Sequence, residues 1–203
     1  MPQEFVGVEA HRGDMVWSAA VPEELRSRAT AVIGNFPVSQ AAQYTRLEWL
    51  QTFSAGVDAY ICPGVLPRGT MVTNASGAYG QSVSEHMFAT MWALMKNLNR
   101  YASNQRDHQW QDEGPVLSPE GGIALIIGVG DIGSHFAQLA QSVGMRTFGV
   151  RRHADVPAKG IEKMYGFERL ETLLPLADVV AMAVPRSPQT HHLLNADRLG
   201  RLK

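Results

Sequence analysis

Short apolar segments separated by polar or turn-forming residues characterise the first third of the chain. They lie at residues 5–8, 31–33, 47–53 and 71–74. Apolar runs of this length, bounded by turn signals, are typical of strands. The pattern therefore predicts an open α/β arrangement for this part of the chain.

The pattern changes at Ser82, where apolar residues begin to recur every three or four positions. Ser82 and Glu85 form a capping-box signature, which predicts that a long helix begins here. We interpret the methionine-rich stripe of this helix as packed core, with a partner-binding face as the alternative. The stripe consists of Val83, Met87, Met91, Leu94, Met95 and Leu98.

Strands and helices alternate in the second half of the chain. The run GGIALIIG at 121–128 is apolar throughout, as expected for a parallel strand that is covered on both faces. A helix is then predicted at 134–143, a strand at 145–150, a helix near 168–174 and a strand at 178–184. This βαβ alternation predicts a doubly wound parallel sheet.

A glycine fingerprint, GVGDIG, occupies residues 128–133, which we call the glycine turn. Gly128 allows a tight turn out of the strand, Gly130 lets the backbone approach a pyrophosphate, and Gly133 lets the helix pack closely on the strand. The N–H groups at the start of that helix can bind phosphate. The turn therefore predicts a dinucleotide-binding site, and a glycine-rich turn without a ligand is the alternative.

Two arginines stand where the second strand of this sheet ends. In a dinucleotide-binding sheet this place faces the adenosine ribose, where an acid binds the 2′-hydroxyl of NAD and an arginine accommodates the 2′-phosphate of NADP. Arg151 and Arg152 occupy it, and no acidic residue follows before Asp155. The sequence therefore favours NADP, with NAD possible. The alternative is that either arginine points into solvent.

Composition narrows the possible partners. The 18 basic and 19 acidic residues give a formal net charge of -1, which provides no field to attract nucleic acid or an anionic membrane. Cys62 is the only cysteine, so no internal disulfide can form and a cytoplasmic location is expected. No apolar run of the sequence approaches the roughly 18 residues of a membrane helix.

Four blocks of the sequence have the order and spacing of a known family. They are LEWLQTFSAGVDAY at 47–60, VTNASGAYGQSVSEHMFATMWALMKNL at 72–98, GVGDIGSHFAQLAQSVG at 128–144 and LPLADVVAMAVPRSPQTHHLLN at 174–195. On these blocks the chain resembles the D-isomer-specific 2-hydroxyacid dehydrogenases. The match covers most of the chain beyond residue 46 and is far more specific than the glycine turn alone.

The resemblance implies an α/β protein with two domains, both incomplete. Residues 1–78 are expected to belong to a smaller, flavodoxin-like substrate domain, and residues 79–203 to a Rossmann-type cofactor domain with its first four strands. The active site is expected in the cleft between them. The implied reaction is hydride transfer between NADP(H), or NAD(H), and a D-2-hydroxy acid or 2-keto acid.

The resemblance also assigns residues to ligands. The turn formed by Ser54, Ala55 and Gly56, which we call the serine turn, is expected to present backbone N–H groups to the substrate carboxylate. A plain strand-to-helix turn is the alternative. Asp131 and Ile132 match positions that contact the pyrophosphate. The positions that line the nicotinamide side are matched by Val184, Pro185 and Thr190.

Three catalytic residues of the family have no match in this sequence. Its members use an arginine to hold the substrate carboxylate, a histidine to exchange the proton, and an acid to raise the pKa of that histidine. All three are expected beyond Lys203, so we interpret the chain as a fragment of a longer protein. No metal site is expected at His191 and His192, which lack ligand partners at suitable spacing.

Two functions remain open from the sequence. The first is a fragment of an NAD(P)-dependent oxidoreductase, inactive by itself, whose substrate is a small 2-keto or 2-hydroxy acid. The alternative is a nucleotide-sensing interaction protein on the same fold. Family members commonly dimerise through the helix that matches the one from Ser82, so a homodimer of the full-length protein is expected.

Overall fold

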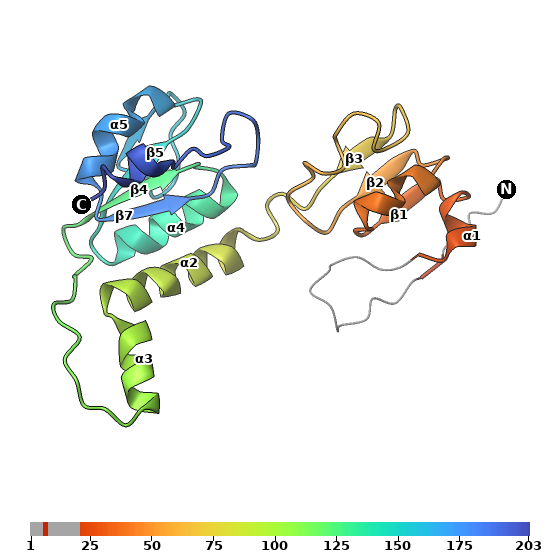
Figure 1. Cartoon of the computed structure of the whole chain (residues 1–203). Coiled ribbons are helices and arrows are strands. Elements are labelled where there is room, and N and C mark those ends of the chain that lie inside the picture. The colour runs from red at the N-terminus through yellow and green to blue at the C-terminus, as the bar shows by residue number, and fades with distance from the viewer. Residues whose placement is uncertain (1–5, 8–20) are drawn as a thin grey trace. The chain divides into compact units, whose positions relative to one another are not determined.

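Two parallel sheets organise the chain, one in each of the units Met1–Ala78 and Tyr79–Lys203 (Figure 1). The structure is a computed structural model, and it describes residues 6–7 and 21–203. The strand expected at residues 5–8 therefore lies largely outside the described residues. The roles expected for the two units, substrate binding and cofactor binding, stay predictions.

The first unit contains a three-stranded parallel sheet with the order β1-β2-β3. The strands are β1 (Ala31–Ile33), β2 (Trp49–Gln51) and β3 (Met71–Thr73), and the short helices are α1 (Glu23–Arg26) and η1 (Val38–Gln43). The strands confirm three predicted segments, with the same bounds for β1 and tighter bounds for β2 and β3. Leu50 of β2 is fully buried and packs in one cluster with Phe36, Tyr44 and Tyr60.

The second unit contains a four-stranded parallel sheet with the order β6-β5-β4-β7 (Figure 1). The strands are β4 (Ile123–Ile127), β5 (Arg146–Val150), β6 (Lys163–Tyr165) and β7 (Val179–Met182). The first strand along the chain lies between the second and the fourth, which is the order of a doubly wound nucleotide-binding sheet and confirms the predicted fold class. The sequence did not locate β6, because its three residues are too few to show alternation.

Helices cover both faces of this sheet, which explains why β4 is apolar throughout. Ala124 and Ile126 pack in a cluster with α2 and α4, whereas Leu125 and Ile127 pack in a cluster with α5. The helices are α2 (Gly80–Met95), α3 (Leu98–Arg106), α4 (Asp131–Ser142), α5 (Leu170–Leu173) and α6 (Ala196–Leu199), with η2 (Phe167–Arg169) and η3 (Leu174–Leu176) flanking α5. Within the described residues, no helix is both long and apolar enough to cross a membrane.

The helix predicted to begin at Ser82 begins earlier, at Gly80. No side chain caps its start, and Glu85 accepts a hydrogen bond from Nε2 of Gln81 at 2.9 Å instead of reaching back to the cap. The capping-box prediction is therefore wrong. A Cβ atom on Gly80 would overlap the carboxylate of Asp131, so the close approach of α2 to α4 fixes this end of the helix.

The predicted long helix is two helices, and its apolar stripe is only partly core. Asn97 adopts a left-handed conformation with φ of 53° between α2 and α3, so Leu98 starts a new helix. Met91 and Met95, one turn apart, are buried against the sheet, whereas other members of the stripe are exposed. The interpretation as packed core is therefore wrong for the exposed members, which are Val83, Leu94 and Leu98.

Candidate functional site

The glycine turn lies at the carboxyl end of β4, a central strand of the second unit. β5 and β7 pair with opposite edges of β4, and all three strands are parallel, so the segments that follow them begin at the same end of the sheet. In open α/β sheets, ligands bind at such a point, where the chain connections diverge. The turn and the loops after β5 and β7 are therefore the parts of this unit best placed to form a ligand site.

Two glycines of the turn are required by close backbone contacts. Gly128 has a φ of +93°, and a Cβ atom there would overlap the carbonyl of Ala183 and the side chain of Val184. A Cβ atom on Gly133 would overlap the carbonyl oxygen of Gly128. These contacts hold the turn against the end of β7 and hold α4 against β4.

Gly130, in contrast, borders open space. Apart from its chain neighbours, a Cβ atom there would have no atom within 4 Å, and Gly130 precedes α4 without a side-chain cap. Among the described residues, no group accepts a hydrogen bond from the N–H of Gly130, Asp131 or Ile132. Available N–H groups at a helix N-terminus beside open space fit the pyrophosphate of a dinucleotide. The residues present therefore fit the expected cofactor.

Asp131 and Ile132 offer their backbone to this space. The carboxylate of Asp131 is engaged elsewhere, because its Oδ1 lies 3.4 Å from Nδ1 of His135 and the carboxylate also lies against Gly80 of α2. Ile132 is half-buried in the first turn of α4. The contribution expected of both residues to pyrophosphate binding therefore rests on their N–H groups.

The loop after β7 is fixed by Thr190. Its Oγ1 donates to the carbonyl of Pro185 at 2.6 Å and accepts from the N–H of Ser187 at 2.9 Å. Val184, at the start of the loop, lies where a Cβ atom on Gly128 would be. The structure thus places Val184, Pro185 and Thr190 in one loop that begins beside the glycine turn. Their contact with a nicotinamide stays a prediction.

The two arginines after β5 differ in their surroundings. Arg151 is half-buried, and its guanidinium donates to the backbone carbonyls of Val129, His153 and Val156. Arg152 is exposed and, within the described part of the chain, forms no hydrogen bond or ion pair. The alternative that an arginine points into solvent is therefore wrong for Arg151.

The serine turn follows β2 in the first unit, and its carbonyl oxygens are all occupied. Each accepts a hydrogen bond at 2.8 Å, and the donors are Oγ1 of Thr52 for Ser54, Nδ2 of Asn74 for Ala55, and Oγ of Ser54 for Gly56. For the N–H groups of the same three residues, the structure shows no acceptor among the residues it describes. A turn with available N–H groups and occupied carbonyls favours an anion.

Sequence reasoning did not identify the side chains that shape the serine turn. Asn35 accepts from the N–H of Phe53 at 3.0 Å and donates to Oγ of Ser54 at 3.3 Å. Asn35, Thr52 and Asn74 each come at or just after the end of a different strand of this sheet. Because parallel strands end at the same edge, polar residues in these positions were the signal that could have found them.

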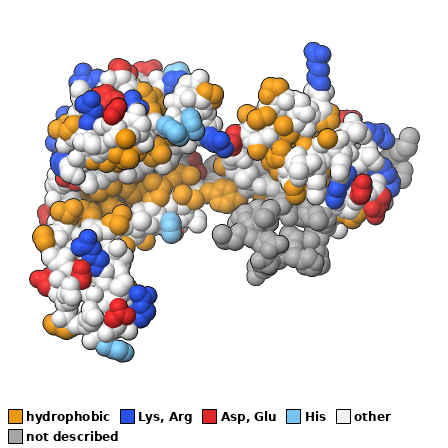
Figure 2. Space-filling view, viewed as in Figure 1, with side chains coloured by type: hydrophobic (Ala, Val, Ile, Leu, Met, Phe, Trp, Pro, Cys, Tyr) orange, Lys and Arg blue, Asp and Glu red, His pale blue; other side chains and the backbone are white. Residues whose placement is uncertain are grey.

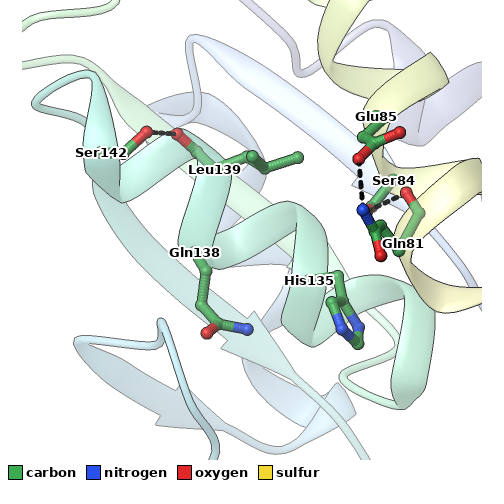
Figure 3. Close-up of a pocket in the computed structure, with 7 residues that line it drawn as sticks. All are labelled: Gln81, Ser84, Glu85, His135, Gln138, Leu139 and Ser142. Atoms are coloured by element: carbon green, nitrogen blue, oxygen red, sulfur yellow. Dashed lines mark hydrogen bonds between the residues drawn. The ribbon is translucent and has the colours of Figure 1, made fainter.

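A separate groove of about 270 Å³ lies between α2 and α4 (Figure 3). Figure 3 shows Gln81 and Glu85 of α2 bonded to each other, with His135 and Gln138 on the neighbouring helix. None of the residues predicted to bind a ligand lines this groove. It is therefore distinct from the site formed around the glycine turn.

Residues 88–203 match the family model described as "D-isomer specific 2-hydroxyacid dehydrogenase, NAD binding domain". The matched stretch contains the glycine turn, both arginines and the loop after β7. This finding agrees with the fit of the glycine turn to a dinucleotide. Residues 88–203, which make up most of the second unit, therefore match a domain that binds a nicotinamide cofactor.

Known proteins of this kind resemble the chain over most of its length. Glycerate dehydrogenase from Methylorubrum extorquens is 26% identical over 192 residues, which are 90% of this chain and 58% of that protein. Glyoxylate reductase from Thermofilum pendens is 28% identical over 166 residues, which are 77% of this chain and 48% of that protein. The chain therefore spans about half the length of the curated relatives it matches.

A solved structure shows the same arrangement of strands and helices. It is that of a D-isomer specific 2-hydroxyacid dehydrogenase family protein from Aeromonas salmonicida subsp. salmonicida. The two chains are 30% identical and have a TM-score of 0.78, and the match covers 89% of this chain and 58% of that one.

Proposed function

This chain belongs to the D-isomer specific 2-hydroxyacid dehydrogenase family, and we propose that it forms part of an oxidoreductase that transfers a hydride between a nicotinamide cofactor and a D-2-hydroxy acid or 2-keto acid. The glycine turn carries the proposal. Gly128 and Gly133 are required by close contacts, Gly130 borders open space, and the N–H groups that follow have no acceptor among the described residues. That combination supports binding of a pyrophosphate.

The residues of this chain bind and orient the two reactants. The chemistry that a bound nicotinamide would supply is hydride transfer from the hydroxy acid or to the keto acid. The N–H groups of Gly130, Asp131 and Ile132 would hold the pyrophosphate, and the loop of Val184 and Thr190 would line the nicotinamide side. The proton that accompanies the hydride requires an acid–base residue.

The serine turn supports a substrate with a carboxylate. Three N–H groups of Ser54, Ala55 and Gly56 lack acceptors within the described residues, and neighbouring side chains occupy the carbonyls that would repel an anion. These donors recognise the acid group that all 2-keto and 2-hydroxy acids share. The turn therefore supports the substrate class and not one particular side chain.

We further propose that NADP(H) is the preferred cofactor and NAD(H) the second. Arg151 and Arg152 follow β5, where the ribose of a bound dinucleotide is expected, and no carboxylate stands there before Asp155. An arginine at this place favours a 2′-phosphate, and an acid would favour the 2′-hydroxyl of NAD.

A homodimer in the cytoplasm completes the proposal. Leu94 is 65% exposed, Leu98 is 51% exposed, and Trp110 after α3 is fully exposed. Figure 2 shows apolar side chains along the part of this unit where α2 runs, and exposed apolar surface of this kind favours an interface. Cys62, an exposed free thiol, supports a reducing compartment. The mass in solution, measured by light scattering, tests the dimer.

Titration calorimetry tests the cofactor proposal on the chain itself. We expect NADP⁺ to bind more tightly than NAD⁺, and AMP, which lacks the pyrophosphate, to bind at least about tenfold more weakly than NAD⁺. A chain that binds neither dinucleotide contradicts the proposal. We also expect no turnover of glyoxylate or pyruvate by this chain alone, because none of its histidines matches the acid–base histidine of the family and lack of such a residue removes roughly 10²–10⁴ in rate.

A further inference from the structure

Arg151 joins the glycine turn to the loop that follows β5. Its Nε donates to the carbonyl of His153 at 2.9 Å, one Nη donates to the carbonyl of Val156, and the other Nη lies 3.4 Å from the carbonyl oxygen of Val129. Its own N–H donates to the carbonyl of Tyr165 at 3.1 Å. The side chain of Arg151 therefore links the glycine turn to the loop after β5, and its backbone N–H bonds to the end of β6.

The contact of Arg151 with Val129 affects the direction of the N–H of Gly130, which could donate a hydrogen bond to a phosphate. In a planar trans peptide, the carbonyl of one residue and the N–H of the next point in opposite directions. Holding the carbonyl of Val129 therefore directs the N–H of Gly130 away from Arg151. Gly130 borders open space, and among the residues described its N–H has no acceptor. The guanidinium of Arg151 thus helps to aim this donor.

The hydrogen bonds of Arg151 to carbonyls also limit its ability to bind a phosphate. A guanidinium has five N–H donors in a fixed planar arrangement, and three of them are used here. Turning the group toward a ribose phosphate would break contacts that hold the loop of His153 and Val156. Arg152 has no such contacts within the described residues, and its side chain is exposed.

We propose that Arg151 is a positioning residue, which holds the loop after β5 against the glycine turn and so supports binding of NADP and NAD alike. Arg152 makes the contact that distinguishes the 2′-phosphate. This division of roles rests on the proposed dinucleotide site, and it separates two neighbouring arginines that the sequence alone treats as equivalent.

Arg151→Lys and Arg152→Ala test the division, with dissociation constants for NADP⁺ and NAD⁺ measured by calorimetry. Lysine keeps the charge of residue 151 but cannot reach three carbonyls with a planar fork. We expect Arg151→Lys to weaken both cofactors by a similar factor, about five- to tenfold, with their ratio unchanged. We expect Arg152→Ala to weaken NADP⁺ about tenfold and to leave NAD⁺ unchanged.

Hydrogen exchange supplies a readout that does not depend on a cofactor. The amides of Gly128 and Ser134, which lie at either end of the turn and are bonded to the carbonyls of Val150 at 2.8 Å and Gly130 at 2.9 Å, should exchange faster in Arg151→Lys and at the parent rate in Arg152→Ala. The inference is overturned if Arg151→Lys lowers the affinity for NADP⁺ alone, or if it leaves both affinities and the exchange of these two amides unchanged. A parent protein that binds neither dinucleotide would instead refute the proposed function. The exchange data would still show whether Arg151 holds the loop after β5 against the glycine turn.

Discussion

The glycine turn and the serine turn both follow a parallel strand and both offer backbone N–H groups, but they are built in opposite ways. The glycine turn requires residues without side chains, because backbone atoms lie where the Cβ atoms of residues 128 and 133 would be. In the serine turn, side chains are added: Thr52 and Asn74 from neighbouring strand ends bond to its carbonyls. Each route leaves a turn in which donors outnumber available acceptors.

The difference determines how visible each site is in a sequence. A turn that excludes side chains requires glycine at fixed positions, and these positions can be read directly. A turn shaped by Asn35, Thr52 and Asn74 depends on residues from three strands that become neighbours only in the folded sheet. The serine turn was therefore recognised by family resemblance, while the glycine turn was derived from spacing.

Gly133→Ala should give the largest effect, because the close packing of the glycine turn leaves no room for a side chain at this position. Alanine is ordinarily the better residue inside a helix, but here its methyl group would overlap the carbonyl oxygen of Gly128. We expect a loss of about 3 kcal/mol in the stability of the second unit and loss of dinucleotide binding. Urea unfolding followed by circular dichroism measures this, and parent-like stability would contradict the geometry of the turn.

Gly130→Ala is the matched control in the same turn, and it should separate binding from stability. A methyl group there meets no atom of the folded chain within 4 Å beyond its neighbours, so unfolding should change by less than about 0.5 kcal/mol. The methyl group would occupy the space that a pyrophosphate approaches. We expect NADP⁺ and NAD⁺ each to bind about tenfold more weakly in calorimetry. Unchanged affinity would show that this space is not used.

Asn74→Asp tests the serine turn, where a side chain must be altered instead of added. The substitution keeps an oxygen that accepts from the N–H of Ser76 but removes the donor to the carbonyl of Ala55, and it places a negative charge beside the turn. In calorimetry we expect a 2-keto acid to bind about fivefold more weakly to this variant than to the parent, because loss of a hydrogen bond of this kind costs about 1 kcal/mol. Asn74→Ala should have a smaller effect, since it adds no charge. Equal dissociation constants for all three proteins would exclude the serine turn from substrate binding.

Sequence patterns predicted most of the fold because each pattern has a local cause. The apolar run of β4 reflects burial on both faces, and alternation of strands and helices reflects a parallel sheet. The errors have non-local causes. The start of α2 depends on the contact of Gly80 with Asp131, and the end of that helix depends on a left-handed residue, Asn97, whose amide bonds to a distant loop. Neither contact is visible in the helix itself.

The same limit applies within the site. The sequence placed Arg151 and Arg152 together at the end of the second strand of this sheet. In the structure both directly follow β5, which ends at Val150. The sequence offered no means of telling them apart, because the carbonyls that engage Arg151 belong to a turn and a loop whose approach is set by the tertiary fold. Positions in a motif can therefore be read from sequence more safely than the partners of each side chain.

Asp178→Asn should give the smallest effect and should act on stability without acting on either turn. Asp178 precedes β7 at the end of the sheet opposite the glycine turn, where its carboxylate accepts from the N–H of Ile123 at 2.8 Å and from Nζ of Lys203 at 2.6 Å. Burial alone would raise the pKa of Asp178, but these hydrogen bonds and the charge of Lys203 outweigh it and hold the pKa below its usual value.

A carboxyl whose pKa is lower in the folded than in the unfolded chain stabilises the fold above the unfolded pKa of about 3.9, and that contribution is lost as pH falls through the folded pKa. At pH 7 we expect the variant to be less stable by about 1 kcal/mol, with the gap closing below about pH 4 and with the affinity for NADP⁺ unchanged. Urea unfolding at a series of pH values measures the gap, and a difference that grows toward acid pH would contradict the sign of the shift.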